Sequence, residues 1–391
     1  MIEGGPESYA LIIGIGSYRD ERIPPLRFVH SDAEAFKATL TDPTRGCFKP
    51  EHVRTLLDDQ ATAYNIKHHI SGWLFKEASA NSTVVVIFAG HGHMESDRLG
   101  IEKDGMAKYL LPWDASPDNL FASAISNNEF NRLLSTVKAK RMVIFMDACY
   151  SGGLSTTGAG SRDIGMVEDP FKKLTEGEGR IVIAAAKPNQ RSWEDESIGH
   201  GIFTHHLIEA LSGKADSDGD GYVSILEVFR YLEEHVPDSA RRLANSLQEP
   251  LLWGDVAKDI RLTVNTEKIR QLKAELDKER AERKAQLKRA REATFQLLTD
   301  GKIDTPTSQK ILELIEREPE PLMPRERTAV GLLEAVMRGA VDASLLVDAV
   351  QVAAAARDAA PRARFCTNCG ATAKAGAKFC TGCGAQLRVQ G

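Results

Sequence analysis

The sequence lacks any apolar run long enough to cross a membrane, which requires about 20 consecutive apolar residues. The best candidate, the Ala-rich stretch 341–360, is interrupted by Asp342, Asp348 and Asp358. Residues 1–8 are polar and acidic, so they do not resemble a signal peptide. With 391 residues, 42% hydrophobic and 27% charged, the chain has room for one α/β domain plus smaller appendages. These features predict a soluble, cytoplasmic protein.

Cysteine is scarce, and most of it is confined to one place. Of six cysteines, four fall within the last 26 residues as two C-x-x-C pairs, whereas Cys47 and Cys149 stand alone. A disulfide framework would spread its cysteines through the fold, so this distribution favours a reducing compartment and a metal site in the tail. A strong excess of one charge is also missing. The net charge of -5 gives no general reason to expect nucleic acid as a partner.

The first 260 residues alternate between apolar runs and helical patterns. Four short apolar runs are typical of strands buried on both faces of a parallel sheet: 9–15, 84–90, 141–147 and 180–185. Helical patterns lie between or after these runs, at 31–40, 63–80, 128–137 and 202–212. The alternation predicts an α/β architecture, a mostly parallel β-sheet sandwiched by helices. We assign 1–262 to this domain, 263–300 to a charged helix, 301–360 to a helical region and 361–391 to a small zinc ribbon.

Two of the predicted strands run directly into residues that carry chemistry. His91 lies between two glycines after the second strand, and Cys149 follows the third strand. In open α/β sheets, sites form beyond the carboxyl ends of the strands, and an imidazole can take the proton of a cysteine thiol. We therefore predict a dyad with Cys149 as nucleophile and His91 as general base. The backbone amides of Gly92 and Cys149 would stabilise the developing oxyanion.

Either residue alone has a simpler structural interpretation. A single cysteine is usually a small buried hydrophobe, and a single histidine is often a hydrogen-bonded polar residue without a catalytic role. The occurrence of both, each after an apolar strand, favours the catalytic interpretation. His93 competes for the role of base, and His91 is preferred because it lies directly between two glycines, nearer the strand end.

The chain resembles the caspase-like cysteine peptidases, and more closely the metacaspases and their bacterial relatives, over residues 8–260. Four ordered motifs carry the resemblance: 9–18 followed by 26–33, 88–92, 147–153, and 184–194 followed by 201–204. Animal caspases have Gln two residues before the nucleophile, whereas this chain has Asp147 there, as metacaspases do. The resemblance implies a caspase-like fold and a cysteine-type endopeptidase.

Asp147 indicates a preference for basic substrates, because a carboxylate pairs with a cationic side chain. The resemblance implies that metacaspases cleave after Arg or Lys. It also implies that Asp147 and an acid of the first helix, here Asp32, line the pocket for the residue before the scissile bond. A simpler interpretation of Asp32 is a carboxylate favoured by the helix dipole. The predicted partners are protein or peptide substrates with Arg or Lys at that position.

Residues 216–227 match the twelve-residue calcium loop of EF-hands, with Gly221 at the sharp turn. The predicted oxygen ligands are Asp216, Asp218, Asp220, Tyr222, Ser224 and Glu227. The alternative is a degenerate loop that connects two helices and binds nothing. Many metacaspases require calcium, although this loop is not the general site of that family. We hypothesise that calcium orders this region and switches on the peptidase.

The polar segment 154–179 reads as an exposed loop between two strands. With the residue that follows, it carries four basic residues: Arg162, Lys172, Lys173 and Arg180. An enzyme that cuts after basic residues is therefore predicted to process itself within 155–180. A surface loop without processing is the simpler alternative.

Residues 266–293 are dense in Glu, Lys, Arg, Ala and Leu and contain neither Gly nor Pro, which predicts one long charged helix. Three apolar residues between 269 and 276 fit a heptad seam, but the next core-type positions are polar: Glu279, Arg283 and Gln286. Self-association through 266–298 and a solvated stalk with pairs such as Glu279 with Arg283 are both compatible with this pattern. Asp300-Gly301 is expected to end this helix, and a shorter helix is predicted at 307–318.

Two near-identical C-x-x-C knuckles lie ten residues apart near the C-terminus. Four thiolates at this spacing close a tetrahedral zinc site, and the predicted ligands are Cys366, Cys369, Cys380 and Cys383. The segment resembles small zinc ribbons, in which structural zinc supplies most of the folding free energy. A redox role is disfavoured because no thioredoxin-like pattern surrounds the cysteines. Recognition of an unknown protein partner, nucleic-acid contact and simple capping are all open as its role.

Two other functions are compatible with these motifs. One is a caspase-like scaffold without activity whose zinc ribbon binds a partner, and the other is a calcium sensor with secondary peptidase activity. The presence of both His91 and Cys149 favours the peptidase, because an inactive relative would usually have lost one of them. We therefore predict a calcium-activated cysteine endopeptidase that also holds structural zinc.

Overall fold

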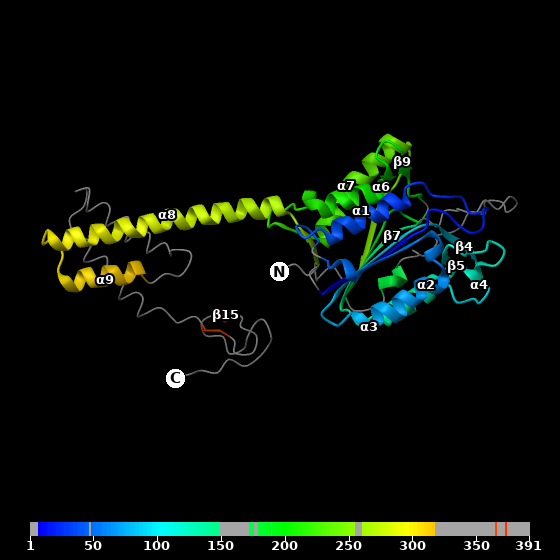
Figure 1. Cartoon of the computed structure of the whole chain (residues 1–391), viewed down its shortest axis with the longest axis horizontal. Coiled ribbons are helices and arrows are strands. Elements are labelled where there is room, and N and C mark those ends of the chain that lie inside the picture. Colours follow the sequence, from blue (N-terminus) through cyan, green and yellow to red (C-terminus); the bar gives the residue numbers. More distant parts are fainter. Residues whose placement is uncertain are drawn as a thin grey trace. The chain divides into compact units, whose positions relative to one another are not determined.

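The computed structural model describes residues 7–46, 48–148, 172–175, 179–188, 190–254, 260–316, 364–365 and 372–373. The chain divides into two compact units, Met1–Lys273 and Ala274–Gly391, and each is described by itself. The first unit contains the predicted α/β domain (Figure 1).

The core of the first unit is a six-stranded sheet in the order β12-β8-β7-β3-β1-β2. Its strands are β1 (Ser8–Gly14), β2 (Val53–Leu57), β3 (Thr83–Ala89), β7 (Arg141–Asp147), β8 (Arg180–Ala184) and β12 (Leu251–Gly254). Neighbours are parallel throughout, except that β12 pairs antiparallel with β8 at one edge. Every residue of β1 and β3 is buried, which explains their continuous apolar sequence.

Helices cover both faces of the sheet, as the alternation of patterns predicts. One face carries α1 (Val29–Thr41), α6 (Ile202–Glu209) and α7 (Ile225–Ala244) (Figure 1). The other carries α2 (Ala63–His68), α3 (Phe75–Glu77) and α5 (Asn127–Ser135). Side chains along β1 alternate between the two cores, because successive residues of a strand point to opposite faces. Leu11 and Ile13 join one apolar cluster, and Ala10 and Ile12 join the other.

The predicted helices at 63–80 and 202–212 are helical segments with irregular hydrogen bonding. The first is α2 followed by a π-helical turn, η3 (His69–Leu74), and then α3. Its apolar stripe, Ile66, Ile70 and Leu74, is fully buried. The second is α6 followed by a π-helical turn, η5 (Ala210–Lys214), in which Gly213 has a φ of +112°. The apolar periodicity therefore located both segments, and local hydrogen bonding decided their inner form.

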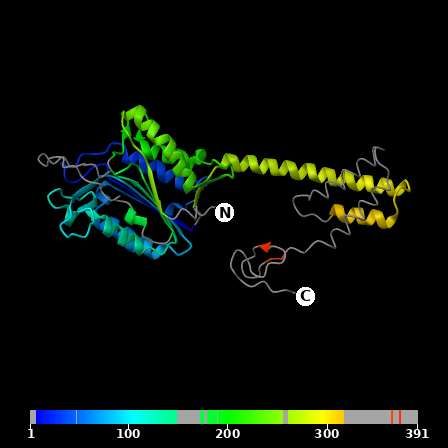
Figure 2. The ribbon, with the colours of Figure 1, turned by 180° about the vertical axis from the view of Figure 1, so that it is seen from behind.

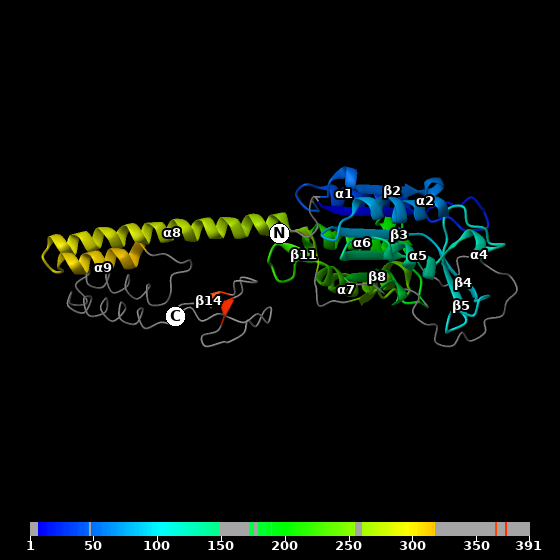
Figure 3. The ribbon, with the colours of Figure 1, turned by 90° about the horizontal axis from the view of Figure 1, so that it is seen from below.

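Three small antiparallel sheets add to the predicted fold of the first unit. The largest contains β4 (Gly92–Ser96), β5 (Met106–Leu110) and β6 (Ile125–Ser126), with α4 (Leu120–Ser123) beside it at one end of the domain (Figure 3). The others pair β9 (Glu194–Asp195) with β10 (His200–Gly201), and β11 (Tyr222–Ser224) with β13 (Arg261–Val264). Three 3-10 turns complete the unit: η1 (Pro50–His52), η2 (Asp58–Gln60) and η4 (Lys172–Thr175).

Helix α8 (Thr266–Thr299) confirms the predicted long charged helix and continues it beyond residue 293. The predicted stop is also confirmed, since Gly301 has a φ of +68° and α9 (Thr305–Glu316) then folds back along α8 (Figure 2). Two ion pairs lie along the exposed surface of α8: Lys278–Glu282 at 4.0 Å and Lys288–Glu292 at 3.8 Å. None of the helices in the described part of the chain combines the length and hydropathy needed to span a bilayer.

Candidate active site

Strands β3 and β7 end side by side at the carboxyl edge of the central sheet. Ala89, the last residue of β3, is aligned with Asp147, the last residue of β7. The Gly90 N–H donates to the Asp147 carbonyl over 3.2 Å. His91 follows directly, so the structure brings His91 and Asp147 to the same edge. Cys149, two positions after Asp147 in the sequence, lies outside the described residues.

The His91 side chain is 8% exposed and is held by the segment before α1. Its Nε2 lies 2.8 Å from the Pro24 carbonyl oxygen, and its backbone N–H donates to the Tyr18 hydroxyl over 2.8 Å. The Tyr18 ring stacks beside the imidazole with 5.5 Å between centroids. A carbonyl oxygen can only accept a hydrogen bond, so Nε2 must carry the proton. In the neutral ring this leaves the lone pair on Nδ1 available to accept a proton.

Burial lowers the pKa of His91, although the Pro24 carbonyl and the charge of Glu194 act in the opposite direction. A lowered pKa keeps the imidazole neutral near pH 7, which is the form that acts as a base. Burial also lowers the pKa of His93, the competing candidate, on strand β4. Within the described residues, the buried Nδ1 of His93 has no hydrogen-bond partner. The bond to a backbone carbonyl therefore distinguishes His91 from His93.

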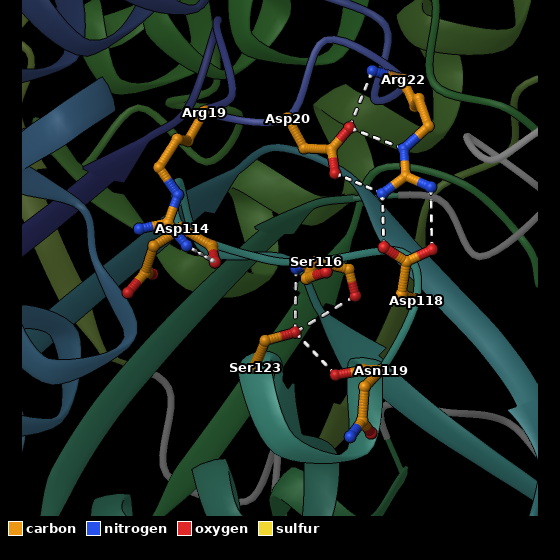
Figure 4. Close-up of polar contacts among 8 residues, drawn as sticks. All are labelled: Arg19, Asp20, Arg22, Asp114, Ser116, Asp118, Asn119 and Ser123. Carbon is orange, nitrogen blue, oxygen red and sulfur yellow. Dashed lines mark hydrogen bonds and ion pairs between the residues drawn. The ribbon is translucent and has the colours of Figure 1, made fainter.

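The segment that carries Pro24 is tied to a neighbouring loop by Arg22 (Figure 4). The Arg22 guanidinium bonds to both carboxylate oxygens of Asp20 and of Asp118, at 2.7–2.9 Å. Arg22 and Asp118 are 56% and 75% exposed, so solvent screens their pair and it contributes little to stability. The pair joins the turn that leads to Pro24 to the segment that contains Asp118. Figure 4 shows further contacts of the two loops, among Arg19, Asp114, Ser116, Asn119 and Ser123.

Asp32 and Asp147, the two predicted pocket acids, lie together beside Gly201. The Gly201 N–H donates to Asp32 Oδ2 over 3.1 Å. A Cβ at Gly201 would lie 3.1 Å from Asp32 Oδ2 and 3.5 Å from Asp147 Oδ2, so glycine leaves room next to both carboxylates. His200 Nδ1 lies 2.6 Å from Asp32 Oδ1, and the Thr204 hydroxyl donates to Asp147 Oδ2 over 3.0 Å.

The electrostatics of this pair favour a bound cation. Burial, followed by the charge of Asp147, raises the pKa of Asp32 to about 8. Burial likewise raises the pKa of Asp147, and Glu194 adds to both increases. Like charges buried together are unfavourable. A cationic group that enters beside them would relieve the repulsion and bring both pKa values down.

Glu194 was not predicted as a site residue, yet it joins the carboxylate pair to the first helix. Its two carboxylate oxygens accept the backbone N–H groups of Arg27 and Phe28, each over 3.0 Å. These amides are at the N-terminus of α1, where the helix dipole favours an acid, and α1 carries Asp32 one turn later. Four further contact residues were also not predicted: Tyr18, Pro24, His200 and Thr204. Tyr18 and Thr204 lie within the motifs that carry the family resemblance, so the sequence offered a signal for them. Pro24 and His200 lie outside those motifs.

Residues 7–260 match the peptidase family described as the caspase domain. The chain belongs to the caspase-domain family. This membership confirms the predicted fold and the predicted enzyme class of the domain, a cysteine-type peptidase. Metacaspase-1 of Candida glabrata is 27% identical over 216 residues, covering 54% of this chain and 52% of that protein. Metacaspase-3 of Arabidopsis thaliana is 30% identical over 129 residues, covering 31% of this chain and 34% of that protein.

Metacaspase-1 of Yarrowia lipolytica is 32% identical over 115 residues, covering 28% of this chain and 24% of that protein. The chain thus spans between 24% and 52% of the length of these three curated relatives. Among solved structures, caspase-1 from Spodoptera frugiperda aligns with a TM-score of 0.40 and 15% identity, covering 66% of this chain and 90% of that chain. The Geobacter sulfurreducens protein GSU0716 aligns with a TM-score of 0.44 and 18% identity, covering 64% and 94%.

The predicted calcium loop of this caspase domain, residues 216–227, begins after η5, contains β11 and ends in the first turn of α7. One carboxylate oxygen from each of Asp216, Asp218 and Glu227 lies within 4.8 Å of the other two. Within the described part of the chain, the buried Oδ1 of Asp216 has no hydrogen-bond partner, and burial raises the pKa of this carboxyl. Gly221, at the sixth loop position, has a φ of +84°, which suits glycine. Three predicted ligands therefore converge on a bare carboxylate oxygen, an arrangement that fits a divalent cation.

The other predicted calcium ligands have contacts of their own. Asp220 forms an ion pair of 2.7 Å with Arg261, and Ser224 caps α7 by accepting the Glu227 N–H over 3.4 Å. Tyr222 lies in β11, which pairs with β13. A cation in the loop would therefore compete with Arg261 for Asp220.

The predicted self-processing segment needs one correction. Arg180 is not part of an exposed loop, because it is the first residue of β8 and is only 6% exposed. Its guanidinium donates to Asn131 over 2.7 Å and to Ser135 over 3.1 Å, so peptidases would not reach it in the folded chain. Lys172 and Lys173 belong to the turn η4, and Arg162 lies outside the described residues.

The zinc-ribbon domain family matches residues 365–387, which agrees with the predicted ribbon. Two short strands of this segment are described, β14 (Arg364–Phe365) and β15 (Thr372–Ala373), and they pair antiparallel. The four predicted zinc ligands lie outside the described residues: Cys366, Cys369, Cys380 and Cys383.

Proposed function

We propose that this caspase-domain chain is a cysteine endopeptidase in which Cys149 is the nucleophile and His91 is the general base. The observation that supports this most directly is the contact between His91 Nε2 and the Pro24 carbonyl, because it leaves Nδ1 able to take a proton. Cys149 follows β7 and His91 follows β3, and these strands are neighbours in the sheet. The two reacting groups therefore come from adjacent strand ends.

In the proposed reaction, His91 Nδ1 takes the thiol proton of Cys149, and the thiolate sulfur attacks the carbonyl carbon of the scissile bond. The backbone N–H groups of Gly92 and Cys149 then hydrogen-bond to the oxyanion. The C–N bond breaks as the imidazolium returns the proton to the leaving amine. Water hydrolyses the acyl-enzyme, with His91 again acting as the base.

We further propose that the residue before the cleaved bond is Arg or Lys. The paired carboxylates of Asp32 and Asp147 beside Gly201 support this choice, because both are less favourable as isolated anions than as partners of a cation. The implied specificity of the metacaspases points the same way. An Asp side chain at this position would instead add a third negative charge.

A matched set of peptides that differ only in this residue tests the proposed function. We expect Arg and Lys peptides to exceed the neutral analogue citrulline by at least about 100-fold in kcat/KM, which corresponds to roughly 2.7 kcal/mol. A preference for Asp would refute the basic specificity. Failure to cleave any peptide, with calcium present, would favour the scaffold function.

The pH dependence of Arg-peptide hydrolysis is expected to report on Asp32. Because the pKa of Asp32 is about 8, kcat/KM should rise with pH through this value as the carboxylate forms. In Asp32→Asn this rise should disappear, and the remaining kcat/KM should be lower. Initial rates measured on both sides of pH 8 check the first expectation, with the exposed Asp238→Asn as the control. If kcat/KM of Asp32→Asn rose with pH in the same way, the titrating group would be a residue other than Asp32.

The raised pKa of Asp32 also predicts how the free energy of unfolding depends on pH. Its folded-state pKa is about 8 and its ordinary value is near 4, so the stability that it contributes at low pH is lost progressively as the pH rises from about 4 to about 8. Asn keeps the two contacts, since its amide oxygen can accept from Gly201 and its NH₂ can donate to His200. Above pH 8, Asp32→Asn is therefore expected to raise the free energy of unfolding by more than about 1.4 kcal/mol. Denaturant unfolding at two pH values measures this difference.

We also propose that the loop 216–227 binds calcium and that its ordering activates the peptidase. The converging oxygens of Asp216, Asp218 and Glu227 support this proposal. Helix α7 begins directly after β11 and packs on α6, which carries Thr204 beside Asp147. A change in the loop would therefore reach the carboxylate pair through one pair of helices.

Asp216→Asn separates calcium binding from folding. Without calcium, this variant should unfold at the same temperature as the wild type or higher, because the change removes the charge of a half-buried carboxylate that has one bare oxygen. At a calcium concentration 100 times the dissociation constant, the wild type should gain about 2.7 kcal/mol, and the variant much less. Thermal unfolding with and without calcium measures both effects, with Asp238→Asn as the control. Equal calcium shifts in the wild type and Asp216→Asn would place the calcium site elsewhere.

The remaining proposals concern the segments around the catalytic domain. The four thiolates of Cys366, Cys369, Cys380 and Cys383 form a donor set that fits structural zinc, and the ribbon is proposed to bind a protein partner. Helix α8 is proposed to support self-association. Self-processing is proposed within 155–179, after Arg162, Lys172 or Lys173.

A further inference from the structure

A group of histidines lies on the pair α6–α7, outside the proposed dyad and the calcium loop. His205 and His206 are neighbours on α6, and Glu209 follows one turn later. Glu209 Oε2 lies 3.0 Å from His206 Nδ1 and 3.8 Å from His205 Nε2. One ligand atom from each of the three residues lies within 4.8 Å of the other two. Two imidazole nitrogens and a carboxylate oxygen therefore lie close enough together to contact one metal ion.

The surroundings of this cluster hold its members in the forms that bind metal. Burial lowers the pKa of His206, so its ring is neutral near pH 7. Burial raises the pKa of Glu209, but hydrogen bonds from Lys214, His206 and Tyr231 outweigh this and lower it to about 2. Glu209 is therefore ionised across the physiological range. Neutral imidazole and ionised carboxylate are the ligand states that metal binding requires.

Residues of α7 brace the cluster from behind. His206 Nε2 lies 2.8 Å from the Ser239 hydroxyl, and the Tyr231 hydroxyl donates to Glu209 Oε2 over 3.1 Å. In the metal-free chain, Nδ1–H of His206 donates to the ionised Glu209 carboxylate, and Nε2 accepts from the Ser239 hydroxyl. When a metal ion replaces the proton on Nδ1, the proton moves to Nε2 and Nε2–H donates to Ser239, which is the outer contact that a ligating histidine usually has. The structure thus supplies outer contacts that aim both ligands.

The cluster is also open to an incoming ion. The His205 and Glu209 side chains are 29% and 23% exposed, so solvent reaches them. Lys214 pairs with Glu209 Oε1, but its side chain is 59% exposed, and its ammonium group can turn into solvent when a cation replaces it. A bound divalent ion would replace Lys214 as the charge partner of Glu209, and its double charge would attract the carboxylate more strongly.

We propose that His205, His206 and Glu209 form a binding site for a late first-row divalent metal ion, Zn²⁺ in particular. Zinc accepts two imidazole nitrogens and one carboxylate oxygen and completes its coordination with water. Calcium and magnesium prefer all-oxygen sites, so this site differs in selectivity from the loop 216–227. The proposed site consists of residues other than the four cysteines of the zinc ribbon.

The position of the site links it to the carboxylate pair. Thr204, the residue before His205, donates to Asp147, and the His205 ring lies 6.2 Å from the ring of His200, which contacts Asp32. A metal ion at His205 therefore binds α6 one residue after Thr204, which contacts Asp147, and a few residues after β10, whose His200 and Gly201 contact Asp32.

Equilibrium dialysis of the full chain against a series of free Zn²⁺ concentrations tests the proposal. The parent carries Cys149→Ala, so that the nucleophilic thiol binds no zinc and the chain does not cut itself. His205→Ala and Glu209→Gln in this parent should each bind one zinc fewer per chain, while the ribbon contributes equally to all. His68→Ala, an exposed histidine of α2, is the matched control and should bind as much zinc as the parent. Ser239→Ala, which removes an outer contact, should weaken this one site about 10–100-fold.

Thermal unfolding supplies a second measurement that does not depend on peptidase activity. Added Zn²⁺ should raise the unfolding temperature of the parent and of His68→Ala more than that of His205→Ala. Because His205 is partly exposed, His205→Ala is expected to fold. If Glu209→Gln does not fold, His205→Ala alone decides the result. Equal zinc binding by the parent and His205→Ala would overturn the proposal, as would an equal loss in His68→Ala.

Discussion

Replacing Cys149 with alanine is expected to abolish hydrolysis of Arg peptides, and His91→Gln is expected to lower kcat/KM by about 10²–10⁴-fold. Gln can still donate to the Pro24 carbonyl and so preserves the packing of the site. It cannot take the thiol proton, and a free cysteine thiol with a pKa near 8.5 is only a few per cent thiolate at pH 7. It also cannot return a proton to the leaving amine. The residual activity of His91→Gln should therefore rise with pH as the thiol ionises without help.

His93→Gln is the matched control for this experiment, because it makes the same change two residues further along the same motif. Its kcat/KM should stay within about tenfold of the wild type, since it lacks a role in proton transfer. Steady-state rates on one Arg peptide, with calcium present, measure all three variants. If His93→Gln were inactive and His91→Gln active, His93 rather than His91 would be the general base.

Asp147→Asn is expected to lower kcat/KM for Arg peptides by about 10²–10⁴-fold, because it removes one partner of the ion pair with the substrate, a loss of roughly 3–5 kcal/mol. Asn has nearly the same shape and can still accept the hydrogen bond from Thr204. The wild type should discriminate strongly between Arg and citrulline peptides, whereas the variant should treat them alike. The ratio of the two kcat/KM values isolates the charge contribution from any general loss of activity.

Two control measurements test whether the effect of Asp147→Asn is specific to the charge of Asp147. Glu196→Gln removes an exposed acid that pairs with Arg27 near the same pocket, and it should leave the Arg-to-citrulline ratio unchanged. Alkylation of Cys149 by iodoacetamide should proceed at similar rates in the wild type and Asp147→Asn, because the dyad is intact in both. If Asp147→Asn kept full discrimination for Arg, the second acid, Asp32, or another group would have to carry the specificity.

Much of the first unit could be predicted from local sequence patterns. Strands β1, β3, β7 and β8 are buried on both faces, so their sequences are continuous apolar runs that differ clearly from amphipathic helices. Strand β2 has partly exposed residues, and β12 at the other edge is half-buried, so neither has that signature. Their places in the sheet depend on pairing with β1 and β8, which are contacts between distant segments.

The loop 216–227 also shows that a local motif predicts local geometry but not contacts with distant segments. Its spacing correctly placed three acids within reach of one another, because a fixed turn geometry dictates where positions 1, 3 and 12 fall. The ion pair between Asp220 and Arg261 could not be predicted, since Arg261 arrives on β13 from outside the motif.

The sequence by itself determined which chemical groups stand at the strand ends: a histidine between glycines after β3, and an acid two residues before a cysteine after β7. Only the tertiary structure decided how these groups are held. The Pro24 carbonyl that orients His91 lies 67 residues earlier in the chain, and the His200 ring that contacts Asp32 lies 168 residues later. Strand ends follow from local apolar patterns, whereas the proton position on His91 and the raised pKa of Asp32 depend on desolvation and on contacts that form only when distant segments pack together.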